Sequence, residues 1–312
     1  MNAGPNEAIR HVEVPNLLRA VKRRIPKPLK SAARGAVRTY GVRTAARRAL
    51  PDFLIIGAKR GGTTSLWNWL VRHPHVAPMF PATQQIKSPH YFDINFSKGL
   101  DWYRSHFPTV RSLRHAARRD GIRPQCGEAS PYYLFHPEVG ARIAQALPDV
   151  RLVVSLRNPA DRAYSNYWER RGSNAENLDT FEAAINAEPQ RLAGETERLL
   201  TDPGYYSHHH DCHSYLARGC YADQLEALFG HVDPERVLVV IFDDLVADPA
   251  GTYALVQRFL RLPIVDVPEL EHHHRLPVPP MADQTRARLV EYYRPHNVRL
   301  AKLLDRQLDW DR

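Results

Sequence analysis

Residues 52–66, DFLIIGAKRGGTTSL, join an apolar run to a glycine-rich turn and then to the start of an amphipathic helix. Glycine lets the backbone approach an anion closely, and the free N–H groups of a helix N-terminus point at that anion. The helix dipole favours negative charge at the same place. Further donors come from the side chains of Lys59, Arg60, Thr63, Thr64 and Ser65. The stretch therefore predicts a cradle for a phosphate or sulfate group at the end of a strand.

The same glycine spacing fits the nucleotide-triphosphate P-loop, G-x-x-x-x-G-K-[ST], with its glycines at Gly57 and Gly62. The lysine of that motif reaches the β- and γ-phosphates, but this chain has Thr63 at its position. The positive charges here precede the second glycine instead. Since a glycine-rich turn also serves as a plain strand-to-helix connection, the interpretation needs a second site.

A second β-branched run that ends in polar residues lies at 151–167, RLVVSLRNPADRAYSNY. Asn158 suits a helix N-cap, and Pro159 suits the first helical turn. Arg157 stands at the carboxyl end of the predicted strand, and Ser165 stands two turns into the following helix, so both are placed to bind one anion. Two anion sites at strand ends of one sheet predict a ligand with phosphate-like groups at both ends.

In these two stretches the chain resembles the sulfotransferases that use 3′-phosphoadenosine 5′-phosphosulfate (PAPS), particularly the branch of heparan-sulfate sulfotransferases and their bacterial relatives. The 5′-phosphosulfate loop of that family, G-x-x-K-G-G-T-T-S-L, falls on residues 57–66. Its 3′-phosphate motif, an arginine and a serine eight residues apart, falls on Arg157 and Ser165. Other stretches that look like family landmarks lie at 87–93, 98–103, 127–132, 219–225 and 291–297.

The resemblance covers residues 51–312 and implies an α/β fold, a single domain with a mainly parallel central sheet flanked by helices, of the P-loop-like sulfotransferase type. It implies a PAPS-dependent enzyme that transfers the sulfuryl group to a hydroxyl or amine and leaves adenosine 3′,5′-bisphosphate, with no metal required. The acceptor implied is a small molecule or glycan, namely a carbohydrate, a glycoconjugate or a secondary metabolite. The cofactor-binding residues implied are Lys59, Arg60, Gly61, Gly62, Thr63, Thr64, Ser65, Arg157, Ser165 and, in a loop before the last helix, Arg275.

The chain also departs from the family pattern. Arg60 stands where the family usually has a lysine, and arginine is a poorer proton donor to a leaving phosphate although its fork suits sulfate oxygens. In the family pattern K-E-x-H a glutamate base follows the lysine, but here Ser88 follows Lys87. The family pattern G-E-K-[TS]-P loses its lysine at Ala129. The usual general base is therefore missing.

Sulfuryl transfer needs an acceptor that loses a proton, a nearly in-line approach, and positive groups near the sulfuryl oxygens and the leaving phosphate. Catalytic roles are therefore predicted for Arg60 and Lys87. His90 is the first candidate base because it keeps its family position and histidine titrates near working pH, and Glu128 is the second. The structural alternative for His90 is a packed residue that anchors the Ser88-Pro89 turn.

Length and composition fit one large α/β domain, because 312 residues, 43% of them hydrophobic, can build a substantial core. The sequence contains no run of eighteen apolar residues, so it predicts no membrane span. Charged residues interrupt the apolar residues near the N-terminus, so it predicts no signal-peptide core. The three cysteines, Cys126, Cys212 and Cys220, have no disulfide or metal spacing. We therefore expect a reducing, cytoplasmic setting.

Positive charge is concentrated in residues 1–50, a basic N-terminal extension that we expect to be helical or partly disordered. It holds twelve Lys or Arg and two Glu, a net charge of +10, so the other residues carry −1 of the total of +9. Cationic helices are predicted at 14–21 and 32–46, broken by Pro26 and Pro28, and would make peripheral contact with an anionic membrane or an acidic partner. The alternative is a solvated extension packed on the domain. Nucleic acid is not an expected partner, since no recognised motif accompanies the charge.

Two histidine clusters, at 208–213 and 272–274, raise a metal hypothesis. Adjacent histidines point in different directions, whereas a metal site needs convergent ligands, so no metal site is predicted there.

Hydrophobic patterning predicts strands at 52–57, 124–127, 151–156 and 237–242. It predicts helices at 63–73, 98–107, 137–147, 159–170, 249–262 and 283–305. Residues 174–207 are polar with a helical middle, and they form either a lid that faces the acceptor or a plain surface helix. This alternation predicts ligand binding at the carboxyl ends of a mainly parallel sheet.

Two other functions remain open from the sequence. A nucleotide-dependent phosphotransferase would need Mg²⁺ and the P-loop lysine that Thr63 does not supply. A catalytically weak relative that binds nucleotide or membrane as a scaffold is kept open by Ser88 and Ala129.

Overall fold

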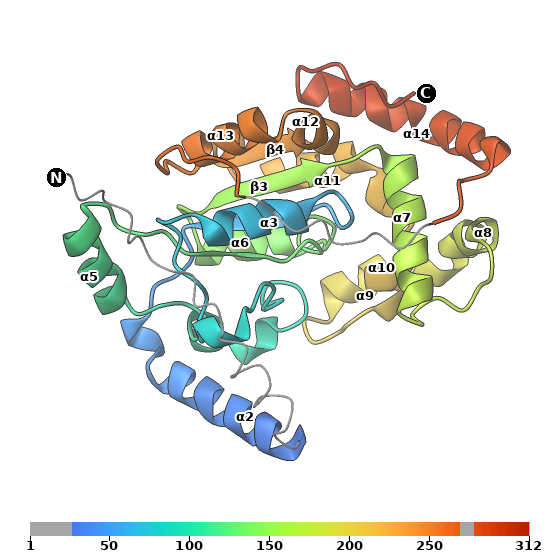
Figure 1. The fold of residues 1–312 in the computed structure, drawn as a ribbon. Helices are drawn as coiled ribbons and strands as arrows, with labels where there is room; N and C mark the ends of the chain where they lie inside the picture. The colour runs from blue at the N-terminus through green and yellow to red at the C-terminus, as the bar shows by residue number, and fades with distance from the viewer. Residues whose placement is uncertain (1–26, 269–277, 312) are drawn as a thin grey trace.

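The computed structural model describes residues 27–268 and 278–311, and its centre is a parallel β-sheet (Figure 1). The strand order is β2-β1-β3-β4, and each neighbouring pair is parallel. The strands are β1 (Phe53–Gly57), β2 (Gly127–Ala129), β3 (Arg151–Leu156) and β4 (Val237–Ile241). Strand β1 is buried along its whole length, which is typical of a parallel strand covered on both faces. The predicted α/β class with a mainly parallel sheet is confirmed.

Helices connect the strands and pack around the sheet (Figure 1). Three helices lie between β1 and β2, one between β2 and β3, and five between β3 and β4 within the described ranges. In chain order they are α2 (Lys27–Arg43), α3 (Thr63–Arg72), α4 (Leu100–Arg104), α5 (Val110–Asp120), α6 (Val139–Ala146), α7 (Pro159–Gly172), α8 (Phe181–Leu192), α9 (Glu195–Thr201), α10 (His208–Cys212), α11 (Tyr221–Phe229), α12 (Phe242–Ala247), α13 (Pro249–Phe259) and α14 (Asp283–Leu303).

Most predicted elements occur within a few residues of their expected bounds, and β3 matches them at both ends. The strand predicted near 124–127 is present but starts later than expected, because β2 begins at Gly127, opposite Phe53 of β1. Gln125 instead exchanges backbone hydrogen bonds with the loop after α3, donating to the carbonyl of His75 at 2.9 Å and accepting from the amide of Ala77 at 2.7 Å. That tertiary pairing keeps the preceding residues out of the sheet.

Four described helices, α5, α10, α11 and α12, were not among the predicted elements. For α5 the local signal was present, since Thr109 caps the helix by accepting from the amide of Ser112 and Gly121 ends it with a positive φ of 74°. The helix predicted at 98–107 is shorter than expected and runs from 100 to 104. Helix α14 continues through Pro295.

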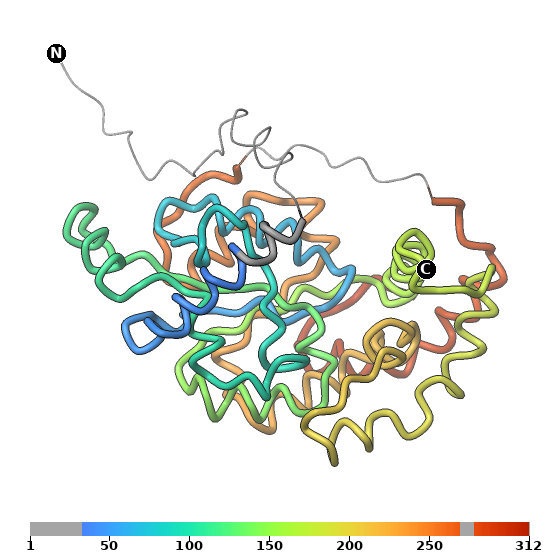
Figure 2. Tube along the Cα trace, turned by 90° about the horizontal axis from the view of Figure 1, so that it is seen from below, coloured from blue at the N-terminus to red at the C-terminus, as the bar shows by residue number. Residues whose placement is uncertain are grey.

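Helix α2 of the predicted N-terminal extension and the predicted lid lie on opposite sides of the molecule (Figures 1 and 2). Helix α2 packs beside α4, where Arg38 Nη1 donates to Ser105 Oγ at 2.8 Å. The helix expected at 14–21 lies outside the described residues. Residues 174–207 form α8 and α9 on the other side. Among the helices that the structure describes, none combines the length and apolar character needed to cross a membrane.

Candidate functional site

The turn between β1 and α3 has the shape of an anion cradle. A Cβ atom on Gly61 would lie 2.3 Å from the carbonyl oxygen of Ser155 on β3, so only glycine fits there. Gly62 has a φ of 93° and forms the N-cap of α3, and no side chain within the described residues caps that helix. Arg60 also has a positive φ, 71°, which a non-glycine residue adopts at a cost. The turn and the helix N-terminus are therefore shaped to receive an anion, with the amide of Ser65 already donating to the carbonyl of Gly62 at 3.0 Å.

Two lysines from different parts of the chain lie at this turn. Lys87 Nζ donates to Thr64 Oγ1 on α3 at 2.9 Å, and Lys59 Nζ lies 3.2 Å from Asp211 Oδ1 on α10. Burial lowers the pKa of Lys87 to about 8. Burial also lowers the pKa of Lys59 to about 8, with the charge of Arg218 adding to the effect and that of Asp211 opposing it. A bound anion would offset this cost of holding two ammonium groups together.

A cavity of about 310 Å³ opens beside these two lysines. It brings together side chains from the first βα turn, the 87–94 loop, the residues after β2, and helices α7 and α10. Its lining residues are Lys59, Lys87, Ser88, His90, Ile94, Pro131, Tyr132, Arg170 and Asp211. Both predicted catalytic residues of the 87–94 loop, Lys87 and His90, therefore face the same space as Lys59.

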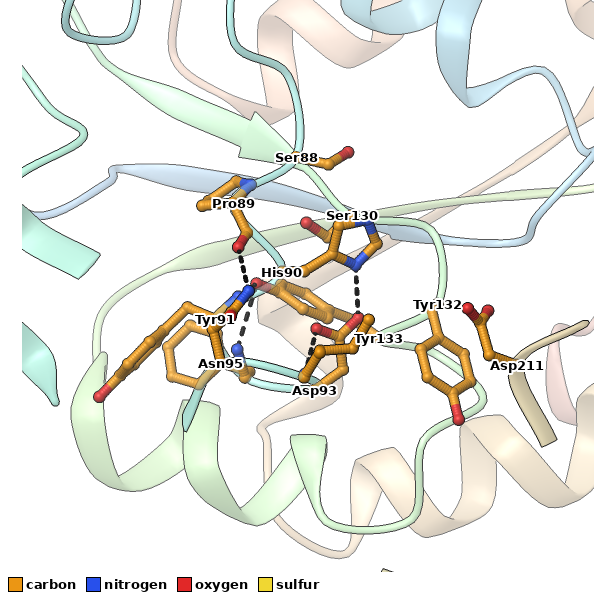
Figure 3. A network of polar contacts seen from close by, with 12 residues as sticks. Ser88, Pro89, His90, Tyr91, Asp93, Asn95, Ser130, Tyr132, Tyr133 and Asp211 are labelled. Atoms are coloured by element: carbon orange, nitrogen blue, oxygen red, sulfur yellow. Dashed lines mark hydrogen bonds and ion pairs between the residues drawn. The ribbon is translucent and has the colours of Figure 1, made fainter. Parts of the chain in front are cut away.

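His90 forms a hydrogen-bonded pair with Asp93 in this cavity wall (Figure 3). Its Nδ1 lies 2.8 Å from Asp93 Oδ2, and the other oxygen of that buried carboxylate accepts from the amide of Ile94 at 2.6 Å. Burial lowers the pKa of His90, but the hydrogen bond and charge of Asp93 raise it, and the net pKa is above the ordinary value. With Nδ1 donating to Asp93, Nε2 is the nitrogen that can accept a proton.

A tight turn holds His90 in place. The amide of Asn95 donates to the carbonyl of His90 at 2.8 Å, and the side-chain amide of Asn95 donates to the carbonyl of Pro89 at 2.9 Å (Figure 3). His90 itself has a φ of 51°, a conformation that the surrounding bonds must maintain. His90 thus both anchors this turn and lines the cavity.

Ser88, at the position of the family glutamate, uses its hydroxyl for a structural hydrogen bond. Its Oγ donates to the backbone carbonyl of Ala129, at the end of β2. The amide of Ala129 donates in turn to the carbonyl of Lys87 at 2.9 Å. These contacts fix the 87–88 backbone beside the sheet edge and so place Lys87 and His90 at the cavity.

Glu128, the second candidate base, lies on β2 with an exposed fraction of 0%. Its carboxylate accepts hydroxyl hydrogen bonds from Tyr103 and Tyr133 at 2.9 Å each and from Ser130 at 2.5 Å. Burial raises the pKa of Glu128 to about 7, although the three hydroxyl donors oppose the rise. Glu128 is not among the residues that line the cavity, so its position suits support of the site rather than contact with an acceptor.

The helix cap predicted within the second motif is confirmed at the start of α7. Asn158 caps the helix through its side-chain oxygen, which accepts from the amides of Ala160 and Asp161, and Pro159 occupies the first turn. The guanidinium of Arg157 lies over the ring of Phe242, 5.1 Å from its centre. The backbone carbonyl of Arg157 accepts a hydrogen bond from Tyr221 OH at 2.9 Å, which connects the end of β3 to α11.

The two motifs are in direct contact, because Arg60 Nε donates to Ser165 Oγ at 3.0 Å. Of the predicted cofactor residues, Lys59 to Gly62 form the turn and Thr63 to Ser65 begin α3. Arg157 and Ser165 lie at the end of the neighbouring strand and on the helix that follows it. Arg275 lies outside the described residues.

The lining residues that were not predicted as functional include Tyr132, Arg170 and Asp211. Asp93, which orients His90, was also not singled out, although its spacing of three residues from His90 was a usable signal. Burial alone would raise the pKa of Asp211, but the charges of Lys59 and Arg218 outweigh burial and lower this pKa to about 2. The carboxylate therefore stays ionised as their counterion. Within the first histidine cluster His209 and His213 do converge, with their Nδ1 atoms 2.9 Å apart. His213 Nε2 is hydrogen-bonded to the carbonyl of Ala175.

Comparison with known proteins places this site in a recognised context. A family model described as "Sulfotransferase domain" matches residues 50–276. The membrane-associated sulfotransferase kil1 of Dictyostelium discoideum is 23% identical over 84% of this chain and 66% of that protein. Human heparan sulfate glucosamine 3-O-sulfotransferase 3B1 is 31% identical over 85% of this chain and 66% of that protein.

Human bifunctional heparan sulfate N-deacetylase/N-sulfotransferase 3 is 29% identical over 82% of this chain and only 30% of that protein. The chain thus spans two thirds or less of the length of these curated relatives. Among solved structures, a sulfotransferase from Alicyclobacillus acidocaldarius superposes with a TM-score of 0.59 at 29% identity. That match covers 85% of this chain and 100% of the other.

Proposed function

The chain belongs to the sulfotransferase domain family, and from this premise we propose that it transfers the sulfuryl group of PAPS to a hydroxyl or amine of a carbohydrate or glycoconjugate. The observation that carries the proposal is the convergence of Lys59, Lys87 and the His90–Asp93 pair on one cavity beside the uncapped N-terminus of α3. Cations and backbone donors suit the phosphosulfate, and a histidine oriented by a carboxylate suits the acceptor proton.

The proton step is assigned to His90. Asp93 holds the ring through Nδ1, so Nε2 accepts the proton that the acceptor hydroxyl or amine loses as it bonds to sulfur. The bond between sulfur and the bridging phosphate oxygen breaks in the same transfer, and adenosine 3′,5′-bisphosphate leaves. This arrangement supplies a base in a chain whose family glutamate is replaced by Ser88.

Charge stabilisation is assigned to the cations of the first turn. Lys59 and Lys87 face the cavity, and Arg60 reaches from the same turn toward α7. As the leaving phosphate gains negative charge, these groups stabilise it more strongly in the transition state than in the bound donor. Arg157 and Ser165 bind the 3′-phosphate at the other end of the donor.

The acceptor class rests on the relatives. Two of them are named for sulfation of heparan sulfate, and one of these is named for its glucosamine 3-O position. The cavity lining includes Tyr132 and Arg170, an aromatic ring and a cation, which we assign to the acceptor. Rings of this kind pack against sugar faces, and guanidinium groups pair with sugar carboxylates or sulfates.

Two measurements test the proposal. Transfer of labelled sulfate from PAPS to a panel of glycan and small-molecule acceptors should give labelled product with the wild-type chain and far less product with the His90→Gln variant. Calorimetry in a metal-free buffer should show binding of adenosine 3′,5′-bisphosphate and not of ATP. Binding of ATP with Mg²⁺ in preference to the bisphosphate would instead support a phosphotransferase. Binding of the bisphosphate with no transfer to any acceptor would support a scaffold role.

A further inference from the structure

A second cavity, of about 490 Å³, lies where the chain after β2 meets α11 and α14. Within the described ranges it shares no lining residue with the cavity that holds His90. Its wall combines apolar side chains with several residues of metal-binding type. Three of these, Cys220, Asp223 and His296, form one cluster.

The three side chains converge from two helices. Cys220 is the N-cap residue of α11, Asp223 stands in the first turn of that helix, and His296 lies on α14. One sulfur, one carboxylate oxygen and one ring nitrogen from these residues all lie within 4.8 Å of one another. The packing of α11 against α14 thus brings together side chains that are far apart in the sequence.

Among the described residues, the donor atoms of His296 and Cys220 have no close hydrogen-bond partner. His296 Nδ1 is buried without a hydrogen-bond partner in the part of the chain that the structure describes, and it lies 3.9 Å from Asp223 Oδ2. Within the described residues the sulfur of Cys220 has long contacts, 3.8 Å to the carbonyl of Leu216 and 4.0 Å to Tyr292 OH. A buried ring nitrogen without a partner is costly unless something binds it.

Hydrogen bonds orient the carboxylate of Asp223 toward His296. Arg299 Nη1 donates to Asp223 Oδ1 at 2.7 Å, and its other terminal nitrogen donates to Glu226 at 2.6 Å. One carboxylate oxygen is thus fixed by the arginine, and Oδ2 is the oxygen nearer His296. Outer hydrogen bonds of this kind commonly orient metal-binding carboxylates.

We propose that Cys220, Asp223 and His296 bind a divalent transition-metal ion of the Zn²⁺ type, which fastens α14 to the N-terminus of α11. Thiolate, imidazole and carboxylate are the ligands that Zn²⁺ takes in proteins, and a sulfur ligand disfavours Mg²⁺ and Ca²⁺. Binding replaces the thiol proton of Cys220 with the metal and releases that proton to solvent. Three protein ligands leave a fourth position for water or a small ligand from the cavity.

Cobalt titration tests the sulfur ligand directly. The untagged full chain, stripped of metal with a chelator, is titrated with Co²⁺, and we expect a thiolate-to-cobalt charge-transfer band in the near ultraviolet that saturates near about one equivalent. The Cys220→Ser variant should lose the band although Cys126 and Cys212 remain. A wild-type chain without the band, or a band that survives in Cys220→Ser, overturns the proposal.

A pair of matched histidine variants tests the second ligand. His296 and His231 both line the cavity, but only His296 belongs to the cluster. Zn²⁺ affinity, measured by competition with a chromogenic chelator, should fall about tenfold or more in His296→Gln and stay unchanged in His231→Gln. Zn²⁺ should also raise the melting temperature of His231→Gln but not of Cys220→Ser. Equal Zn²⁺ affinity in the two histidine variants would mean that the ion binds elsewhere, such as at the runs 208–210 or 272–274.

Discussion

Arg60 on the first βα turn donates from Nε to Ser165 Oγ on α7 at 3.0 Å, across 105 residues of sequence. The contact follows from topology, because β1 and β3 are parallel neighbours and their carboxyl ends meet at one edge of the sheet. Two stretches that each predict an anion site are thereby joined into one surface. A donor with a phosphosulfate at one end and a 3′-phosphate at the other suits that surface.

Replacement of Arg157 should weaken binding of adenosine 3′,5′-bisphosphate more than replacement of Ser165. A charge-assisted hydrogen bond contributes about 1.5–3 kcal/mol, roughly ten- to hundredfold in affinity, whereas a neutral hydroxyl contributes about 1 kcal/mol. Calorimetry on Arg157→Ala and Ser165→Ala measures both. Since Tyr221 bonds the backbone carbonyl of Arg157, the alanine variant keeps that contact and should fold normally. Unchanged affinity in Arg157→Ala would remove the residue from the donor site.

His90→Gln should lower kcat by about 10²–10⁴-fold and leave affinity for the bisphosphate unchanged, because the ring is assigned to the acceptor proton. Asp93→Asn should give an intermediate loss. Its amide cannot hold Nδ1–H in the same way, and loss of the carboxylate lowers the pKa of His90. The acid limb of the rate profile should therefore move to lower pH in Asp93→Asn. Full activity in His90→Gln would return the search for a base to other groups.

How much of this site the sequence could predict depends on the range of the contacts. The His90–Asp93 pair spans three residues, and the Asn158 cap spans two or three, so local patterns contain both. Asp211 reaches the cavity from α10, 152 residues after Lys59. No local sequence pattern predicts a contact between residues so far apart in the chain.

The same distinction holds for the fold. Strand β3 could be predicted to the residue because its apolar, β-branched run is continuous and bounded by polar residues. The start of β2 could not be predicted, because it is set by which segment Gln125 pairs with, the loop after α3 rather than β1. The cluster of Cys220, Asp223 and His296 depends on the packing of α11 against α14 and has no sequence signature.

The pH profile of kcat/KM should be bell-shaped. The acid limb reports His90, whose pKa lies above its ordinary value, and activity rises as the ring loses its proton. The alkaline limb reports Lys59 and Lys87, whose pKa values of about 8 mean that the cations lose charge as pH rises through that range. Because kcat/KM follows the free enzyme, donor binding does not mask these values.

Lys87→Arg separates the two lysines in that profile. Arginine keeps its charge at every accessible pH, so only Lys59 should then titrate on the alkaline side, and the limb should fall less steeply. An alkaline limb of unchanged slope and midpoint would show that Lys87 does not contribute to it.

The basic extension is proposed to contact anionic membrane surfaces. Helix α2 contains no acidic residue, and Arg34 and Arg43 are exposed on it. Each basic residue near such a surface contributes about 1 kcal/mol, so Arg34→Glu with Arg43→Glu should reduce cosedimentation with phosphatidylserine vesicles at least several-fold. Binding to phosphatidylcholine vesicles serves as the uncharged control. Equal sedimentation of wild type and variant would contradict the proposal.

Glu128→Gln should change stability and its pH dependence far more than catalysis. The folded-state pKa of about 7 lies above the unfolded value of 4.5, so the buried carboxyl favours its protonated form. That contribution is fully present below pH about 4.5 and is lost as pH rises through about 7, roughly 3 kcal/mol in all.

The glutamine keeps an oxygen acceptor for Tyr103 and Tyr133 and carries no charge, so the fall in stability between pH 5 and pH 8 should shrink in the variant. Chemical denaturation at several pH values measures this difference. If Glu128 were the general base, Glu128→Gln would lose about 10²–10⁴-fold in kcat. We expect a loss well below that range, because the carboxylate is fully buried and already bonded to three hydroxyls.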